Sequence, residues 1–199
     1  MVLAREELRL LIDSDHLKIG GFDAQYLEPA TYDMRLGSDA FVVSGQSAGT
    51  KDLAANPILI IGASEFALVG TFETLEMPND IVGHFGLKSS LSRRGLYASV
   101  GTQIDPGFRG RLFVSLFNLT PAPIAIGYKD TFLTVEFERL ERPPATGYDG
   151  ANQGEVSSRR GRHRAVSQRT GPEPRKDPSR VRRDHIEPAL RPRRRCAFL

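Results

Sequence analysis

The sequence predicts an all-β fold without disulfides, and two observations indicate the fold class. Short apolar runs rich in β-branched and aromatic residues recur up to about residue 137, separated by Gly, Pro, Asn and Asp. A helical period of apolar residues occurs only near the N-terminus. The single cysteine, Cys196, excludes an internal disulfide framework. Many short strands joined by turn residues are typical of a β-sandwich or a β-barrel.

The predicted helix covers residues 4–13, where Leu8, Leu11 and Ile12 share one face. After it, Met34 and Leu36 alternate with polar residues, as in a strand with one buried face. The small and polar residues of segment 44–56 predict a loop. Further strands are predicted at residues 16–19, 41–43, 58–61, 66–72, 81–85, 98–100, 111–117, 124–126 and 132–137.

The charge distribution divides the chain into two parts. Residues 159–199 hold 14 Lys+Arg against 4 Asp+Glu, whereas the rest is acidic, although the net charge is only +3. We expect residues 1–158 to form one folded domain. The Arg- and Pro-rich tail, 159–199, is expected to be disordered. It is either a solvated extension or a weak contact for nucleic acid.

One polar stretch is a candidate anion site. Between Gly86 and Gly95 the chain gathers hydroxyl groups and cations on a backbone of small residues, which suits phosphate oxygens. The alternative is an ordinary polar turn between strands. The predicted phosphate-binding residues are Lys88, Ser89, Ser90 and Arg93.

A carboxylate follows shortly after this stretch. Asp105 precedes Pro106 and Gly107 and could deprotonate a water for attack on phosphorus, as a general base. The alternative is a turn aspartate that accepts backbone hydrogen bonds. For Asp33 and Arg35 a structural ion pair or a strand-end hydrogen bond is the simpler interpretation. The four histidines lack metal-ligand spacing, so any metal should arrive with a phosphate substrate.

Three segments occur in a characteristic order: Pro29-Ala-Thr-Tyr-Asp-Met-Arg-Leu-Gly37, Lys88-Ser-Ser-Leu-Ser-Arg-Arg-Gly-Leu96 and Ile104-Asp-Pro-Gly-Phe-Arg-Gly110. Together they resemble the successive signatures of the dCTP deaminase/dUTPase superfamily, over residues 1–158. The resemblance implies a distorted, jelly-roll-like β-barrel. It also implies a homotrimer with active sites between subunits and a Mg²⁺-bound pyrimidine deoxynucleoside triphosphate as ligand.

The resemblance also implies roles for single residues. Asp105 matches the aspartate that activates water in dUTPases, and Ser89 matches the phosphate-binding serine. Lys88 stands where an Arg is usual, while Ser90 and Arg93 match the deaminase pattern. Gly101, Thr102 and Gln103 fall where backbone atoms read the pyrimidine, and Tyr148, Gly150 and Gly154 fall in the segment that closes over nucleotide.

Two departures bear on the reaction. Ser115 stands where the deaminases carry a glutamate, and a serine without an adjacent base cannot shuttle the protons that deamination needs. A serine is normal at this point in dUTPases. Thr134 stands where a Gln is usual, which weakens the inference of substrate choice.

We therefore expect hydrolysis of dUTP to dUMP and pyrophosphate, with dCTP deamination as the closest alternative. A catalytically silent nucleotide-binding regulator is a further alternative. The chain has neither a signal-peptide pattern nor an apolar run of membrane-spanning length, which predicts a soluble cytoplasmic protein without a membrane partner.

Overall fold

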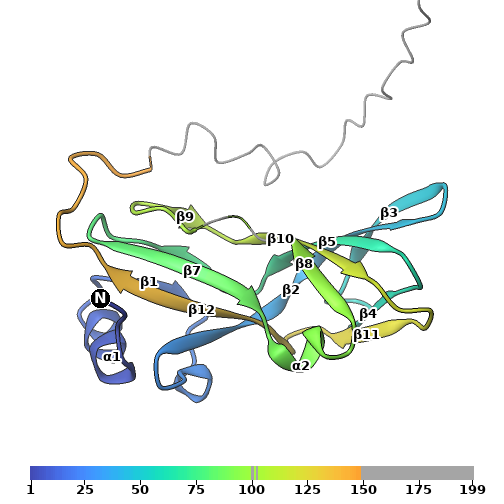
Figure 1. Ribbon diagram of the computed structural model, residues 1–199, viewed down its shortest axis with the longest axis horizontal. Helices are drawn as coiled ribbons and strands as arrows, with labels where there is room; N and C mark the ends of the chain where they lie inside the picture. The colour runs from blue at the N-terminus through green and yellow to red at the C-terminus, as the bar shows by residue number, and fades with distance from the viewer. Residues whose placement is uncertain (100, 102, 149–199) are drawn as a thin grey trace, which may run out of the picture. The chain divides into compact units, whose positions relative to one another are not determined.

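A computed structural model describes residues 1–99, 101 and 103–148, and the all-β prediction is confirmed in them (Figure 1). Strands dominate, and the helical elements are short. The elements are α1 (Arg5–Asp13), β1 (Lys18–Gly20), the 3₁₀ turn η1 (Ala24–Tyr26), β2 (Thr31–Ser44), β3 (Ser47–Asp52), β4 (Ile58–Ile61), β5 (Phe66–Thr71), β6 (Thr74–Glu76), β7 (Ile81–Leu87), α2 (Ser89–Ser92), β8 (Leu96–Ser99), β9 (Arg109–Gly110), β10 (Phe113–Asn118), β11 (Ile124–Gly127) and β12 (Thr131–Arg139).

The main sheet has the order β7-β12-β2-β5-β10-β8, with β3 paired to β2, and every pairing is antiparallel. Its end strands, β7 and β8, contact each other, so the sheet curls into a nearly closed, distorted barrel. Two small sheets, β1-β6-β9 and β11-β4, accompany the main sheet. Among the residues described, no helix is long and apolar enough to cross a membrane.

Strand β2 differs from its prediction. The two short strands expected in this region are one strand of 14 residues, which pairs with β12 through its first half and with β5 through its second. The predicted loop at 44–56 was wrong, because β3 forms a hairpin with β2 there. Every residue of β3 is exposed, so the strand has no apolar alternation by which the sequence could reveal it.

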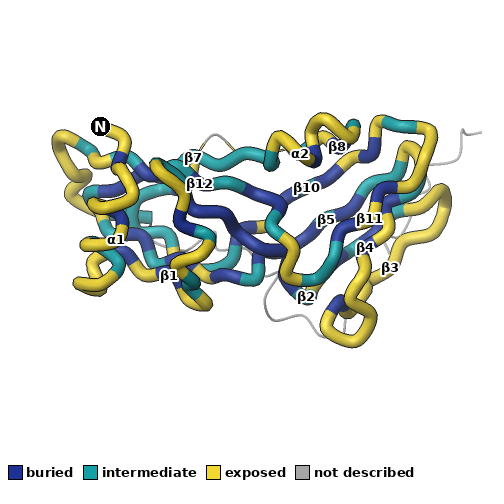
Figure 2. Tube along the Cα trace, turned by 90° about the horizontal axis from the view of Figure 1, so that it is seen from below, coloured by how far each residue is buried: buried dark blue, intermediate teal, exposed yellow. Residues whose placement is uncertain are grey.

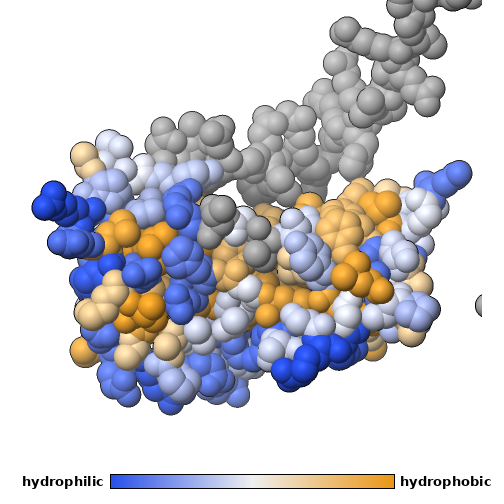
Figure 3. Space-filling view, viewed as in Figure 1, coloured by the Kyte–Doolittle hydropathy of each residue, from blue (hydrophilic) through white to orange (hydrophobic). Residues whose placement is uncertain are grey.

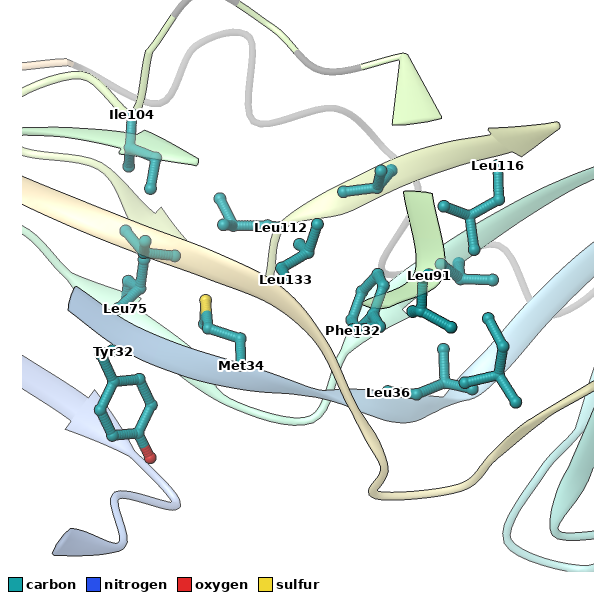
Figure 4. Packing of buried hydrophobic residues seen from close by; sticks show 14 of the residues in the cluster. Tyr32, Met34, Leu36, Leu75, Leu91, Ile104, Leu112, Leu116, Phe132 and Leu133 are labelled. Carbon is teal, nitrogen blue, oxygen red and sulfur yellow. The ribbon is translucent and has the colours of Figure 1, made fainter. Parts of the chain in front are cut away.

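The core lies inside the curled sheet, and α1 packs against one end of it (Figure 2). Leu8 of the helix is fully buried, and Leu11 and Ile12 pack against the same cluster, which confirms the predicted apolar face. Figure 2 shows burial concentrated along the central strands, and α1 and the β3 hairpin are mostly exposed. Figure 4 shows Tyr32, Met34 and Leu36 along β2, opposite side chains from other strands.

The polar side of β2 is buried as well, around Arg35. Its side chain donates to Glu73 Oε1 at 2.6 Å and its backbone N–H donates to Glu73 Oε2 at 2.8 Å. The guanidinium also donates to the Gly21 carbonyl and lies 4.7 Å from the Tyr26 ring centroid and 4.5 Å from that of Phe72. Burial alone would lower the pKa of Arg35, but the hydrogen bond and charge of Glu73 raise it overall. The ion pair predicted for Arg35 is confirmed, with Glu73 as its partner.

Breaking this pair should cost much of the stability of the fold. We expect Glu73→Gln to lower the free energy of unfolding by about 3 kcal/mol, because Arg35 would keep a buried charge without a counterion. Urea denaturation measures this change in the free energy of unfolding. The control is Glu76→Gln, whose carboxylate has exposed pairs with Lys18 and Arg109 at 3.9 and 3.3 Å. It should lose less than about 1 kcal/mol. Equal losses of unfolding free energy in the two variants would contradict the role of the Arg35–Glu73 pair in stabilising the fold.

Candidate functional site

The predicted phosphate segment follows the end of β7 and forms the short helix α2. Leu91 is buried and fixes this turn to the core, whereas Ser89, Ser90 and Arg93 are exposed. Gly95 ends the turn with a φ of 86°, and a Cβ there would lie 2.2 Å from Thr120 Cγ2, so only glycine fits. In Figure 3 strongly hydrophilic residues gather where Figure 1 shows α2. The segment therefore presents hydroxyls and a cation to solvent.

Lys88, directly before α2, already has a partner. Its ammonium group forms an ion pair with Asp33 of β2, whose side chain is almost fully buried. Asp33 lies opposite Thr134 of β12, which in turn lies opposite Gly86 of β7. The structural ion pair expected as one alternative for Asp33 is thus confirmed, with Lys88 as the partner. A triphosphate that binds Lys88 would have to share the ammonium with Asp33.

Asp105 begins a tight turn at the other end of β7. The Phe108 N–H donates to the Asp105 carbonyl at 3.1 Å, and Gly107 has a φ of 83°, as the sequence Asp-Pro-Gly favours. The preceding residue, Ile104, is bridged to Gly83 through two backbone hydrogen bonds of 3.0 and 2.7 Å. These bonds fix the turn to β7. The Asp105 side chain is only partly buried and accepts a hydrogen bond from Gln103 Nε2 at 2.6 Å.

The other predicted site residues lie partly around this turn. Tyr148 donates its backbone N–H to the Pro106 carbonyl at 2.7 Å, and its ring lies 6.1 Å from that of Phe108. Gly101 is exposed. A Cβ on Gly107 would come within 2.9 Å of the Tyr148 nitrogen, so the close approach of this segment requires glycine. Thr102, Gly150 and Gly154 lie outside the described residues.

The segments that carry the acid and the cations attach to opposite ends of β7. Ile104 is bridged to Gly83 near the start of β7, whereas Lys88 follows its end. Lys88 is five positions after Gly83 along the chain, which is roughly 16 Å at the rise of an extended strand. Figure 4 shows Ile104 and Leu91 at opposite sides of the packed core. Although the two motifs are close in sequence, the turn of Asp105 and the helix α2 therefore lie at opposite ends of β7.

Ser115 lies on the outward side of β10, partly exposed. Its partners across the sheet are Leu68 of β5 and Ser99 of β8. None of these neighbours carries a carboxylate. The same side of the strand presents Phe113 and Phe117.

An outer apolar face surrounds Ser115, made by Phe66, Tyr97, Phe113 and Phe117. Tyr97 is 55% exposed and Phe113 43%. The Phe117 ring lies 5.0 Å from that of Phe66 and 6.4 Å from that of Tyr97, measured between centroids. Figure 3 shows apolar residues gathered over β5, β8 and β10. An exposed cluster of aromatic side chains is typical of a surface that contacts another protein.

Two polar contacts of the site were not predicted. The Lys88–Asp33 pair joins segments 55 residues apart, and nothing in the sequence specifies that pairing. The Gln103–Asp105 contact spans two residues, so the local pattern Gln-x-Asp could have suggested it. In the described part of the chain no three His, Cys, Asp or Glu side chains form a possible metal site.

Relatives of the chain are dCTP deaminases. A family model described as dCTP deaminase-like matches residues 2–140. The dCTP deaminase of Pyrococcus horikoshii is 36% identical over 133 residues, which are 67% of this chain and 82% of that protein. The dUMP-forming dCTP deaminase of Aquifex aeolicus is 27% identical over 163 residues, which cover 78% of this chain and 91% of the Aquifex protein.

A solved structure supports the fold independently. The 2′-deoxycytidine 5′-triphosphate deaminase of Agrobacterium tumefaciens matches with a TM-score of 0.60 at 24% identity, over 69% of this chain. The match covers 47% of that protein, so this chain spans about half its length. This similarity confirms the predicted barrel. Because the family model covers most of the described residues, the chain belongs to the dCTP deaminase-like family of the dCTP deaminase/dUTPase superfamily.

Proposed function

We propose that this protein is an enzyme that hydrolyses dUTP to dUMP and pyrophosphate. The observation that carries the proposal is Ser115, whose cross-strand neighbours Leu68 and Ser99 offer no carboxylate. Deamination needs a group that takes a proton from water and returns it to the base, and a serine without a base cannot do so. Asp105 supplies the carboxylate that hydrolysis needs, on a partly exposed turn.

The proposed chemistry follows from the side chains present. Asp105 orients and deprotonates the attacking water, while Lys88, Ser89, Ser90 and Arg93 bind the phosphate oxygens and stabilise the developing negative charge. Backbone atoms at Gly101, Thr102 and Gln103 contact the pyrimidine, and the segment from Tyr148 covers the nucleotide. Mg²⁺ fits as an ion held by the triphosphate, where it neutralises part of the phosphate charge.

We further propose that the site is completed by a second copy in a homotrimer. The separation of Asp105 from Lys88 along β7 supports this, since both groups must reach one triphosphate. The outer apolar face on β5, β8 and β10 offers a surface that such an assembly would bury. The tail at 159–199, its contact with nucleic acid and the cytoplasmic location remain predictions.

Deamination of dCTP is the second candidate, and the names of the relatives favour it. It would need a carboxylate from another copy or from the residues outside the described part, in place of the one absent at Ser115. The dUMP-forming relative is notable because its name combines deamination with the product expected here.

A product assay separates these reactions. We expect pyrophosphate release from dUTP with Mg²⁺ and no ammonia release from dCTP. Asp105→Asn should lower dUTP hydrolysis by about 10²-fold or more, because the general base is lost. The control is Asp39→Asn, whose carboxylate has an exposed pair with Arg111. It should keep full activity. Ammonia from dCTP, or hydrolysis that survives Asp105→Asn, would contradict the proposal.

Mixing two inactive variants tests the shared site. In a cyclic trimer whose sites combine Asp105 of one copy with Arg93 of the next, co-expressed Asp105→Asn and Arg93→Ala chains should regain about a quarter of the wild-type activity at equal amounts. An intact site then forms wherever an Arg93→Ala chain supplies Asp105 and an Asp105→Asn chain supplies Arg93. Activity no higher than that of either variant alone would place both groups in one chain.

A further inference from the structure

The contact between Gln103 and Asp105 is the most specific interaction at the proposed acid. Gln103 Nε2 donates to Asp105 Oδ1 at 2.6 Å, a short distance for a hydrogen bond from an amide to a carboxylate. Among the described residues, Gln103 is the only side chain with a hydrogen bond to Asp105. The second carboxylate oxygen, Oδ2, has no partner in that set.

The backbone on both sides of this contact is fixed. Ile104 lies between the two residues and is bridged to Gly83 of β7, and Asp105 opens the turn that Gly107 makes possible. The side chains of Gln103 and Asp105 are therefore held by a rigid segment, while both remain accessible to solvent. Without the amide, the Asp105 carboxylate would be free to rotate about its side-chain bonds.

We infer that Gln103 is a positioning residue for Asp105, through its side chain rather than through the backbone alone. The amide holds Oδ1 of the ionised carboxylate and leaves Oδ2 directed to the attacking water. Held in this way, the carboxylate accepts the proton of the water from a fixed position. The inference rests on the proposed hydrolysis and adds a residue that determines its rate.

Two substitutions of Gln103 test the inference with dUTP and Mg²⁺. Gln103→Leu removes the donor at similar size and should lower kcat about tenfold, with KM changed less than about twofold. Gln103→Glu places a like charge against Asp105. Gln103→Glu should lower kcat as well, and it should move the acidic limb of the pH–rate profile to higher pH by about one unit. A structural role alone would not move this limb in a folded variant.

A matched control exists in the same chain. Gln25 Nε2 donates to Asp23 Oδ2 at 2.7 Å, again across two residues, in the turn η1. Gln25→Leu should leave kcat, KM and the pH profile unchanged. Thermal unfolding and binding of a non-hydrolysable dUTP analogue check that each variant folds.

A readout without turnover separates this inference from the proposed function. In the ¹³C NMR spectrum at neutral pH without nucleotide, the Asp105 carboxyl carbon should shift in Gln103→Leu and stay unchanged in Gln25→Leu. If the wild type releases no pyrophosphate but this shift occurs, the proposed reaction fails and the contact stands. If the wild type hydrolyses dUTP while Gln103→Leu keeps full kcat, the same pH profile and an unmoved carboxyl resonance, the inference is overturned.

Discussion

The buried ion pair of Arg35 and Glu73 is the interaction on which the rest of the structure depends. Arg35 lies in the part of β2 that passes from pairing with β12 to pairing with β5. Its guanidinium lies between the rings of Tyr26 and Phe72, and Glu73 directly follows the latter. A charge buried in this way is tolerated only when it is fully paired. The pair therefore ties the bend of the main sheet to the segment between β5 and β6.

This constraint places both halves of the proposed site. Asp33 lies two residues before Arg35 on the same side of β2 and contacts Lys88, so the orientation of this strand also fixes the start of α2. The opposite end of β7 receives Ile104, and with it the turn of Asp105. The strand β7 thus lies between the segment of the acid and the segment of the cations. Both segments are attached to this strand, so their separation is fixed by the sheet.

The sequence predicts most elements because their burial is periodic. The apolar face of α1 and the alternating positions of β12 are examples, since side chains of one kind return to the core at a fixed interval. It did not predict β3, whose exposed residues make a strand only by hydrogen bonding to β2. Strand β2, predicted as two short strands, continues through Gly37, where a Cβ would lie only 2.6 Å from the Thr71 carbonyl oxygen. Close contact with β5 is the physical reason for that glycine.

The candidate site is predictable in composition but not in arrangement. Residue types suited to phosphate and to proton transfer are visible in the sequence at Ser89, Arg93 and Asp105. Their distance along the chain is short, but α2 follows the end of β7, whereas Ile104, next to Asp105, pairs with Gly83 near the start of that strand. In the proposed homotrimer, where one copy supplies the acid and the next the cations, an isolated polypeptide would be an incomplete catalyst. The number of complete sites would then rise faster than linearly with the amount of polypeptide, so the level of expression would set a threshold for turnover.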